Sequence, residues 1–119
     1  MNKIPRSSKE SEALLRSLLP AGKEITVRPM FGNLAAFVNG NMSVGLYGED
    51  LMVRLDEPDR KELLKNAGAA IFEPMKGRQM KEYVTLPRPW LSDAAKVKPW
   101  VAKSLKWSGQ LPPKKPKKR

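Results

Sequence analysis

Apolar and polar residues alternate along the chain in a pattern that divides it into helical and extended segments. Near the N-terminus, apolar residues recur at helical spacing from Ala13 to Leu19. They follow Ser7-Ser8-Lys9-Glu10, which has the S-x-x-E form of a capping box. Pro20 and Gly22 then end the pattern. The sequence therefore predicts a first helix over about residues 7–19, with Ser7 as its N-cap.

Short segments with strand character follow this helix. The first, Ile25–Arg28, contains β-branched residues in an alternating pattern. Three more segments are apolar or alternate with period two: Leu34–Val38, Met42–Tyr47 and Leu51–Leu55. Asn39-Gly40 is a strong signal for a hairpin turn. The last three segments are joined by tight connections, and a parallel pairing would need a long crossover. They are therefore expected to form an antiparallel meander.

The second half of the chain adds a helix, two strands and a last helix. Pro58 marks a helix that begins at Asp56 or Glu57, because proline suits the first helical positions. The two strands are expected at Ala70–Glu73 and Lys81–Leu86, and the last helix near Ser92 or Asp93. Pro99 lies inside that helix and predicts a kink or a fresh start there.

This order, α-β-β-β-α-β-β-α, predicts an α+β fold of two layers. A mostly antiparallel five-stranded sheet would carry the helices on one face and leave its other face partly exposed. We expect one domain over residues 1–111, with residues 1–6 flexible and residues 112–119 a disordered basic tail, because the tail has no apolar residue to bury.

Composition narrows the function classes. The 119 residues include no Cys, which excludes disulfides, thiolate catalysis and zinc fingers, and no His, the most common general base. No apolar run approaches the roughly 20 residues of a membrane-spanning helix. The start MNKIPRSSKE becomes polar too early for a signal peptide. We therefore expect a cytoplasmic protein that contacts no membrane.

Charge is concentrated at the C-terminal end. The chain has 23 Lys and Arg against 12 Asp and Glu, a net charge of +11, and its last acidic residue is Asp93. Nine basic residues follow it: Lys96, Lys98, Lys103, Lys106, Lys114, Lys115, Lys117, Lys118 and Arg119. One interpretation is a non-specific electrostatic contact of these residues with the phosphates of a nucleic acid. The other is a solubilising charged end, and the sequence leaves both open.

Two motifs at a characteristic separation point to a family. The first motif is Arg28-Pro29-Met30-Phe31-Gly32, and the second is Gly77-Arg78-Gln79-Met80-Lys81-Glu82-Tyr83. Between them lie Val38-Asn39-Gly40 and Leu51–Leu55. With these segments, the chain resembles the N-terminal domain of the TfoX/Sxy family. These proteins are bacterial regulators of natural competence, and the resemblance covers Leu14 to Trp107.

The resemblance implies a fold similar to type III secretion chaperones. Helices would cover one face of the sheet, and the other face would mediate homodimer contacts. It supplies no catalytic residues. Full competence regulators carry a second, C-terminal domain, so this chain looks like a stand-alone N-terminal module.

The motif residues form a candidate family surface: Arg28, Met30, Phe31, Gly32, Gly77, Arg78, Met80, Lys81 and Tyr83. The Gly77–Lys81 segment is either an anion-binding loop or a hairpin turn, with Gly77 at positive φ and Arg78 paired with Glu73 or Glu82. The Arg28–Gly32 segment either shapes a ligand pocket or fills the edge of the core.

Two further groups of residues have alternative interpretations. Trp90, Trp100 and Trp107 either stack on bases or anchor the last helix, with Trp90 and Trp107 the better candidates for an outward position. The acidic residues Asp56, Glu57, Asp59 and Glu62 suit the N-terminus of a helix better than a magnesium or acid–base site.

Together these features favour a non-enzymatic binding or regulatory module with no cofactor, metal or catalytic residue. Its basic C-terminal end would contact nucleic acid or a protein of a transcription complex. The alternative is a chaperone-like adaptor that binds a protein segment on the exposed sheet face. An enzyme acting on phosphorylated substrates is the third hypothesis.

Overall fold

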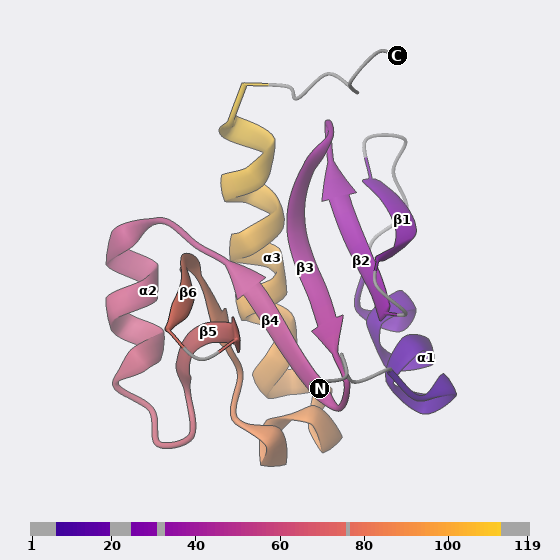
Figure 1. The fold of residues 1–119 in the computed structure, drawn as a ribbon, viewed down its shortest axis with the longest axis horizontal. Helices are drawn as coiled ribbons and strands as arrows, with labels where there is room; N and C mark the ends of the chain where they lie inside the picture. The colour runs from indigo at the N-terminus through magenta and orange to yellow at the C-terminus, as the bar shows by residue number, and fades with distance from the viewer. Residues whose placement is uncertain (1–6, 20–24, 31–32, 76, 113–119) are drawn as a thin grey trace.

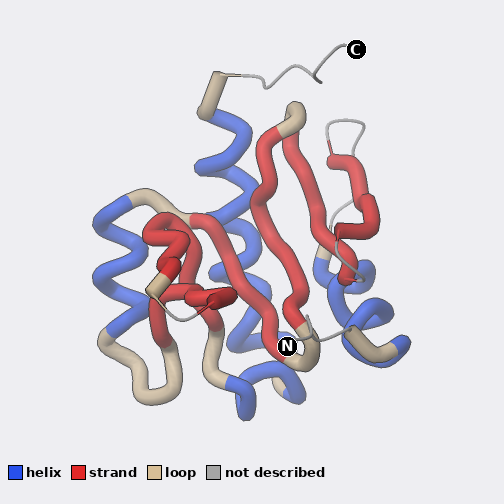
Figure 2. Tube along the Cα trace, viewed as in Figure 1, coloured by secondary structure: helices blue, strands red, loops and turns tan. Residues whose placement is uncertain are grey.

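The computed structural model describes residues 7–19, 25–30, 33–75 and 77–112. Its elements in chain order are α1 (Lys9–Leu18), β1 (Ile25–Met30), β2 (Asn33–Val38), β3 (Asn41–Tyr47), β4 (Asp50–Arg54), α2 (Glu57–Leu64), β5 (Ala70–Met75), β6 (Arg78–Thr85), the 3-10 helix η1 (Arg88–Ser92) and α3 (Ala94–Gln110). Figure 1 shows their arrangement, and Figure 2 separates helix from strand. The α+β class is confirmed.

The strands form one antiparallel sheet in the order β1-β2-β3-β4-β6-β5. The predicted count of five is one too low, because Ile25–Met30 pairs along its whole length with β2. Asn39 and Gly40 both have positive φ, 51° and 86°, which is the backbone of a tight hairpin turn. The meander predicted from that turn is therefore confirmed, with β1 added at its edge.

Capping side chains set where α1 and α2 begin. The N-cap of α1 is Ser8, whose hydroxyl accepts a hydrogen bond from the N–H of Ser11 at 3.1 Å. The prediction of Ser7 is wrong by one residue, because Ser7 instead donates from its hydroxyl to Glu12 at 3.0 Å. Asp56 is the N-cap of α2 and accepts from the N–H of Asp59 at 3.2 Å, as its position before Pro58 indicates.

Pro99 lies inside α3, which is one continuous helix from Ala94 to Gln110 with Asp93 as its N-cap. The predicted fresh start at Pro99 is therefore wrong. Proline leaves the carbonyl of Ala95 without its helical N–H partner. Both Ala95 and Pro99 are exposed, so water can hydrate that carbonyl and the helix continues.

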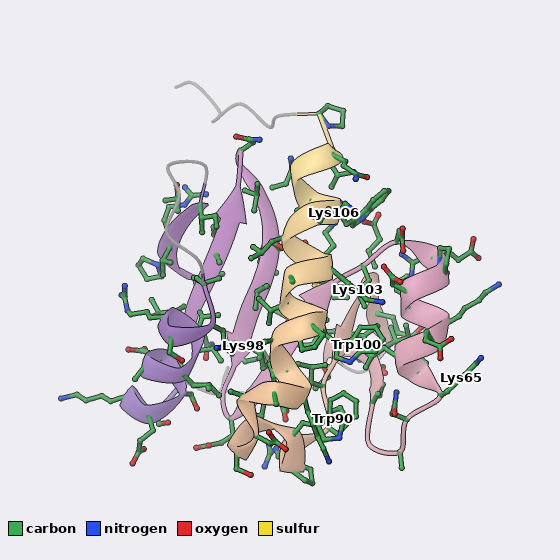
Figure 3. All side chains as sticks on the ribbon, turned by 180° about the vertical axis from the view of Figure 1, so that it is seen from behind. Lys65, Trp90, Lys98, Trp100, Lys103 and Lys106 are labelled. Carbon is green, nitrogen blue, oxygen red and sulfur yellow. The ribbon has the colours of Figure 1, made fainter. Side chains whose placement is uncertain are left out.

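All three α-helices lie on one face of the sheet. Figure 3 shows α3 between α1 and α2, and α3 packs on β2, β3 and β4. Leu15 of α1, Leu63 of α2 and Val101 of α3 join Val44 and Val53 of the sheet in the main core. This core gathers apolar side chains from both layers, as the predicted two-layer architecture requires.

The opposite face of the sheet carries a second, smaller apolar cluster. Phe72 and Tyr83 of the β5–β6 hairpin pack there with Ala35, Met42 and Met52, and each of the five is less than 9% exposed. The hairpin lies between β4 and α2 in Figure 1. Because it curls over this face, the apolar middle of the face is covered by the chain itself.

A β-bulge in β3 turns two successive side chains toward the helix layer. Ala36 of β2 pairs with Val44, but the next residue, Phe37, pairs with Met42, which leaves Ser43 as the extra residue. Val44 enters the main core, and Ser43 meets Ser104 of α3 at 2.8 Å between the hydroxyl oxygens.

The Ser104 hydroxyl connects α3 to two strands. It donates to the carbonyl of Ser43 at 2.9 Å and accepts from the N–H of Arg54 at 3.1 Å. Since its single hydrogen is used for that carbonyl, the hydroxyl of Ser43 is the donor in the contact between the two side chains. Ser43 and Ser104 are both fully buried. These bonds fix the rotation of α3 on the sheet.

Replacing Ser104 by Ala should lower the free energy of unfolding by about 1–3 kcal/mol, because it leaves buried polar groups without partners. Ser108→Ala is the matched control. Ser108 is also fully buried on α3, and its hydroxyl has no partner in the described part of the chain. Both variants gain the same helix propensity. Urea denaturation should show a clear loss of unfolding free energy for Ser104→Ala only. Equal losses in the two variants would contradict a stabilising role of the Ser104 hydrogen bonds.

Candidate nucleic-acid interface

The orientation of α3 about its axis gives it a face buried against the sheet and a basic face in solvent. Val97, Val101, Ser104 and Ser108 are its buried residues. Lys96, Lys98, Lys103 and Lys106 are all exposed. The structure therefore brings the four predicted helical lysines to the solvent side of a single element, at the centre of the helix layer (Figure 3). The predicted basic residues 114–119 lie outside the described residues.

The lysines point toward both flanks of α3. Lys98 lies on the α1 side in Figure 3, where it lines a groove of ≈520 Å³ with Leu18, Leu19 and Leu105 among the other lining residues. Lys103 lies on the α2 side. Lys103 and Lys106 line a second pocket, together with Asp56 and Asp59. Carboxylates line the groove on the α2 side only, so the two flanks of α3 differ in charge.

One of the four lysines has an acidic partner. Lys103 Nζ is 3.6 Å from Asp59 Oδ1, and it also lies 4.9 Å from the centre of the Trp100 ring. In the described part of the chain, Lys96, Lys98 and Lys106 make no ion pair. Their ammonium groups are therefore available to an anion from solution.

The three tryptophans are half-buried, which favours the interpretation as anchors. Trp90 and Trp100 pack against the main core, and the indole nitrogen of Trp107 is buried. Trp90 and Trp107 are each only partly exposed, and an outward position of either ring stays a prediction. Base stacking needs an accessible ring face, so these residues give it little support.

The four acidic residues around the start of α2 each have a local partner. Asp56 is the N-cap, Glu57 pairs with Lys61 at 3.7 Å, Asp59 with Lys103, and Glu62 with Lys65 at 3.4 Å. Among the residues that the structure describes, no three acidic side chains come together as ligands for a metal ion. Their arrangement suits the partial positive charge of a helix N-terminus.

The first family motif lies at the edge strand. Arg28 is exposed on β1, and its guanidinium carbon is 4.2 Å from the centre of the Phe37 ring on β2. This cation–π contact places Arg28 beside the second apolar cluster, against which Phe37 packs. Phe31 and Gly32 lie outside the described residues, as does the side chain of Met30.

The second family motif contains the predicted hairpin turn. Gly77 has φ 84°, and its N–H donates to the carboxylate of Glu73 at 2.6 Å. The turn interpretation is supported by this positive φ. The side chain of Arg78 lies outside the described residues. The expected acidic partners are engaged elsewhere, since Glu73 accepts from Gly77 and Glu82 pairs with Arg54 at 2.8 Å.

The rest of this motif divides between surface and interior. Met80 and Lys81 are exposed, whereas Tyr83 is buried and donates from its hydroxyl to the carbonyl of Met42 at 3.1 Å. Burial raises the pKa of the Tyr83 hydroxyl above its usual value of 10.0, and the nearby Arg54 guanidinium partly opposes the rise. Among the described residues of the family surface, Tyr83 is therefore part of the interior rather than of the surface.

The chain after α3 is attached to the β2–β3 turn. The side-chain amide of Asn41 donates to the carbonyl of Pro112 at 2.9 Å, and Asn41 is only 9% exposed. Pro112 was expected to begin the unstructured tail, but its carbonyl is part of the folded body. A truncation that removes the basic tail should therefore keep Pro112.

Comparison with known proteins identifies the domain. The model of the TfoX N-terminal domain family matches residues 17–107, which span most of the chain. Comparison with curated proteins and with solved structures gives no significant match. In the described part of the chain, no helix has the length and apolar character to cross a membrane.

The raised pKa of Tyr83 predicts a loss of stability at alkaline pH. The unfolded chain ionises this phenol near pH 10, whereas the folded chain keeps it protonated to a higher pH. Its contribution is therefore fully present below pH 10 and is lost as the pH rises further. Tyr83→Phe should lower stability at pH 8 by about 1 kcal/mol, because it removes one hydrogen bond. It should also flatten the decline of stability above about pH 10. Urea denaturation of both proteins at a series of pH values measures this. If their free energies of unfolding decline equally as the pH rises, this account is contradicted.

Proposed function

Because the chain belongs to the TfoX N-terminal domain family, we propose that it is a binding module that holds nucleic acid through α3 and the basic residues after it. The family is not known for catalysis, and its match points to a binding or regulatory role. The contact would be made by lysine ammonium groups with phosphates, without reading the base sequence.

The observation that carries the proposal is the unpaired basic face of α3. Lys96, Lys98 and Lys106 are exposed on one helix and have no ion pair in the described part of the chain. From Ala94 to the last residue the sequence contains no Asp or Glu. An anion approaching this face therefore meets no carboxylate on the element itself.

The position of these charges along the helix supports a role beyond stability. Lys96 and Lys98 lie within the first five residues of α3, near the end that carries the positive helix dipole. Cations there oppose the dipole, whereas acidic residues would be favourable. Departures from such local rules are typical of functional positions.

The shape of the helix layer favours contact along the phosphate backbone. A recognition helix reads bases by entering the major groove, which is about 12 Å wide. Here α3 is flanked by α1 and α2 in the same layer (Figure 3). Such a layer can lie across the backbone of a duplex but cannot insert one helix deeply, which supports the proposed non-specific mode of binding.

The adaptor hypothesis has less support. The middle of the second sheet face is covered by the β5–β6 hairpin, and among the described residues Met80 is the only large exposed hydrophobic side chain. Protein-binding surfaces usually present a larger apolar patch. The homodimer implied by the resemblance stays a prediction.

Fluorescence anisotropy of a labelled DNA duplex, titrated with protein at several salt concentrations, tests the proposal. The triple variant Lys96→Gln, Lys98→Gln, Lys106→Gln should bind more weakly. The slope of log Kobs against log salt should become shallower by about 2–3, because each phosphate contact contributes about 0.9. Truncation after Pro112 should weaken binding further.

The matched control is Lys9→Gln, Lys61→Gln, Lys65→Gln, which removes the same charge from α1, from α2 and from the C-cap of α2 (Lys65 is labelled in Figure 3). We expect it to retain the wild-type slope. Equal losses in the two triple variants would show that only net charge matters and would contradict a defined interface. If the wild-type chain does not bind even at low salt, nucleic acid is not the partner and a protein partner becomes the better hypothesis.

A further inference from the structure

The pocket between α2 and α3 brings two lysines together with the chain's own carboxylates. Lys103, Lys106, Trp107 and Gln110 line it from α3, and Asp56 and Asp59 line it from the start of α2; its volume is ≈340 Å³. Within it, Lys103 Nζ lies 3.6 Å from Asp59 Oδ1, and the two side chains are 47% and 31% exposed. This ion pair is therefore formed at the edge of the basic face of α3.

A carboxylate and a phosphate offer an ammonium group the same kind of partner, a group of anionic oxygens. Asp59 thus occupies one side of a lysine that would otherwise be available to a phosphate. We propose that Asp59 is a built-in competitor of phosphate, which withholds Lys103 from the interface and weakens the binding of nucleic acid. This inference rests on the proposed function of α3.

Asp59 is the one carboxylate of this region placed for such competition. The carboxylate of Asp56 caps α2 by accepting from the N–H of Asp59 at 3.2 Å. Glu57 pairs at 3.7 Å with Lys61, four residues later on the same helix. Asp59 instead reaches across to α3, so its charge acts on the proposed interface directly.

Trp100 keeps Lys103 in place when Asp59 is changed. The Lys103 ammonium lies 4.9 Å from the centre of the Trp100 ring, a cation–π contact that is independent of Asp59. Removing the carboxylate charge therefore leaves the ammonium near its present position, beside Lys106 in the same pocket. The two lysines would then present adjacent positive charges.

Asp59→Asn tests the inference in the same anisotropy titration of a labelled duplex. The half-exposed pair is screened by solvent, so we expect binding at low salt to tighten by about two- to fivefold rather than by orders of magnitude. The slope of log Kobs against log salt should become steeper by about 0.9, the contribution of one added phosphate contact.

Glu57→Gln is the matched control, because it removes the same charge from the same first turn of α2 and faces Lys61 instead of α3. It should leave the slope unchanged. Adding Lys103→Gln to Asp59→Asn should return the slope to the wild-type value, whereas Lys103→Gln alone should change it little.

The outcomes separate this inference from the proposed function. If Asp59→Asn tightens the binding of DNA no more than Glu57→Gln does, while the wild type binds through α3, the inference is wrong and the proposed function stands. If the gain persists without Lys103, the competition does not act on Lys103 and the inference is also wrong. If no variant binds at any salt concentration, both are overturned.

Discussion

The hydrogen bonds of the Ser104 hydroxyl hold α3 to β3 and β4, and the arrangement of the helix layer depends on them. Ser104 meets the carbonyl and the hydroxyl of Ser43 and the N–H of Arg54 in a fully buried position. An unsatisfied polar group there would be costly, so rotations of α3 that break these bonds are disfavoured. The same rotation that buries Ser104 with Val97 and Val101 leaves the lysines of α3 in solvent.

The two faces of the sheet are consequently used in different ways. One face carries the three α-helices, and the other is covered in its middle by the β5–β6 hairpin through Phe72 and Tyr83. Charge on the helix layer is uneven, because α3 contains no acidic residue and α2 begins with several. In the proposed account, this charge pattern would attract a polyanion to α3, and Asp59 would limit the contact on one side. The proposed interface is thus a narrow basic surface rather than a uniformly basic protein.

Much of the fold could be predicted from local sequence. Asn39-Gly40 predicted a hairpin because few residues other than Asn and Gly adopt positive φ, and Asp56 before Pro58 predicted the start of α2. The family could also be identified from the sequence, because two motifs at a fixed separation are more specific than either one alone. The four lysines of α3 were candidates because no acidic residue follows Asp93, whereas their position on the solvent side of one helix is a finding of the structure.

The remaining features arise from contacts between residues far apart in the chain. Ser43 and Ser104 are 61 residues apart, and neither the bulge nor the hydroxyl network has a local signal. Ser104 lies on the buried side of α3, but a serine among apolar residues does not identify Ser43 as its partner. The pairing of Asp59 with Lys103 depends on how α2 and α3 pack, which periodicity does not define.

The most direct test of the central claim is an NMR titration of the 15N-labelled chain with a short DNA duplex at low salt. The account predicts that amide shifts concentrate along Ala94–Gln110 and at the adjoining end of the chain, and that they disappear at high salt. Residues of the second apolar cluster, such as Met52 and Phe72, should be unaffected. Shifts concentrated on that sheet face, with α3 unchanged, would contradict the account.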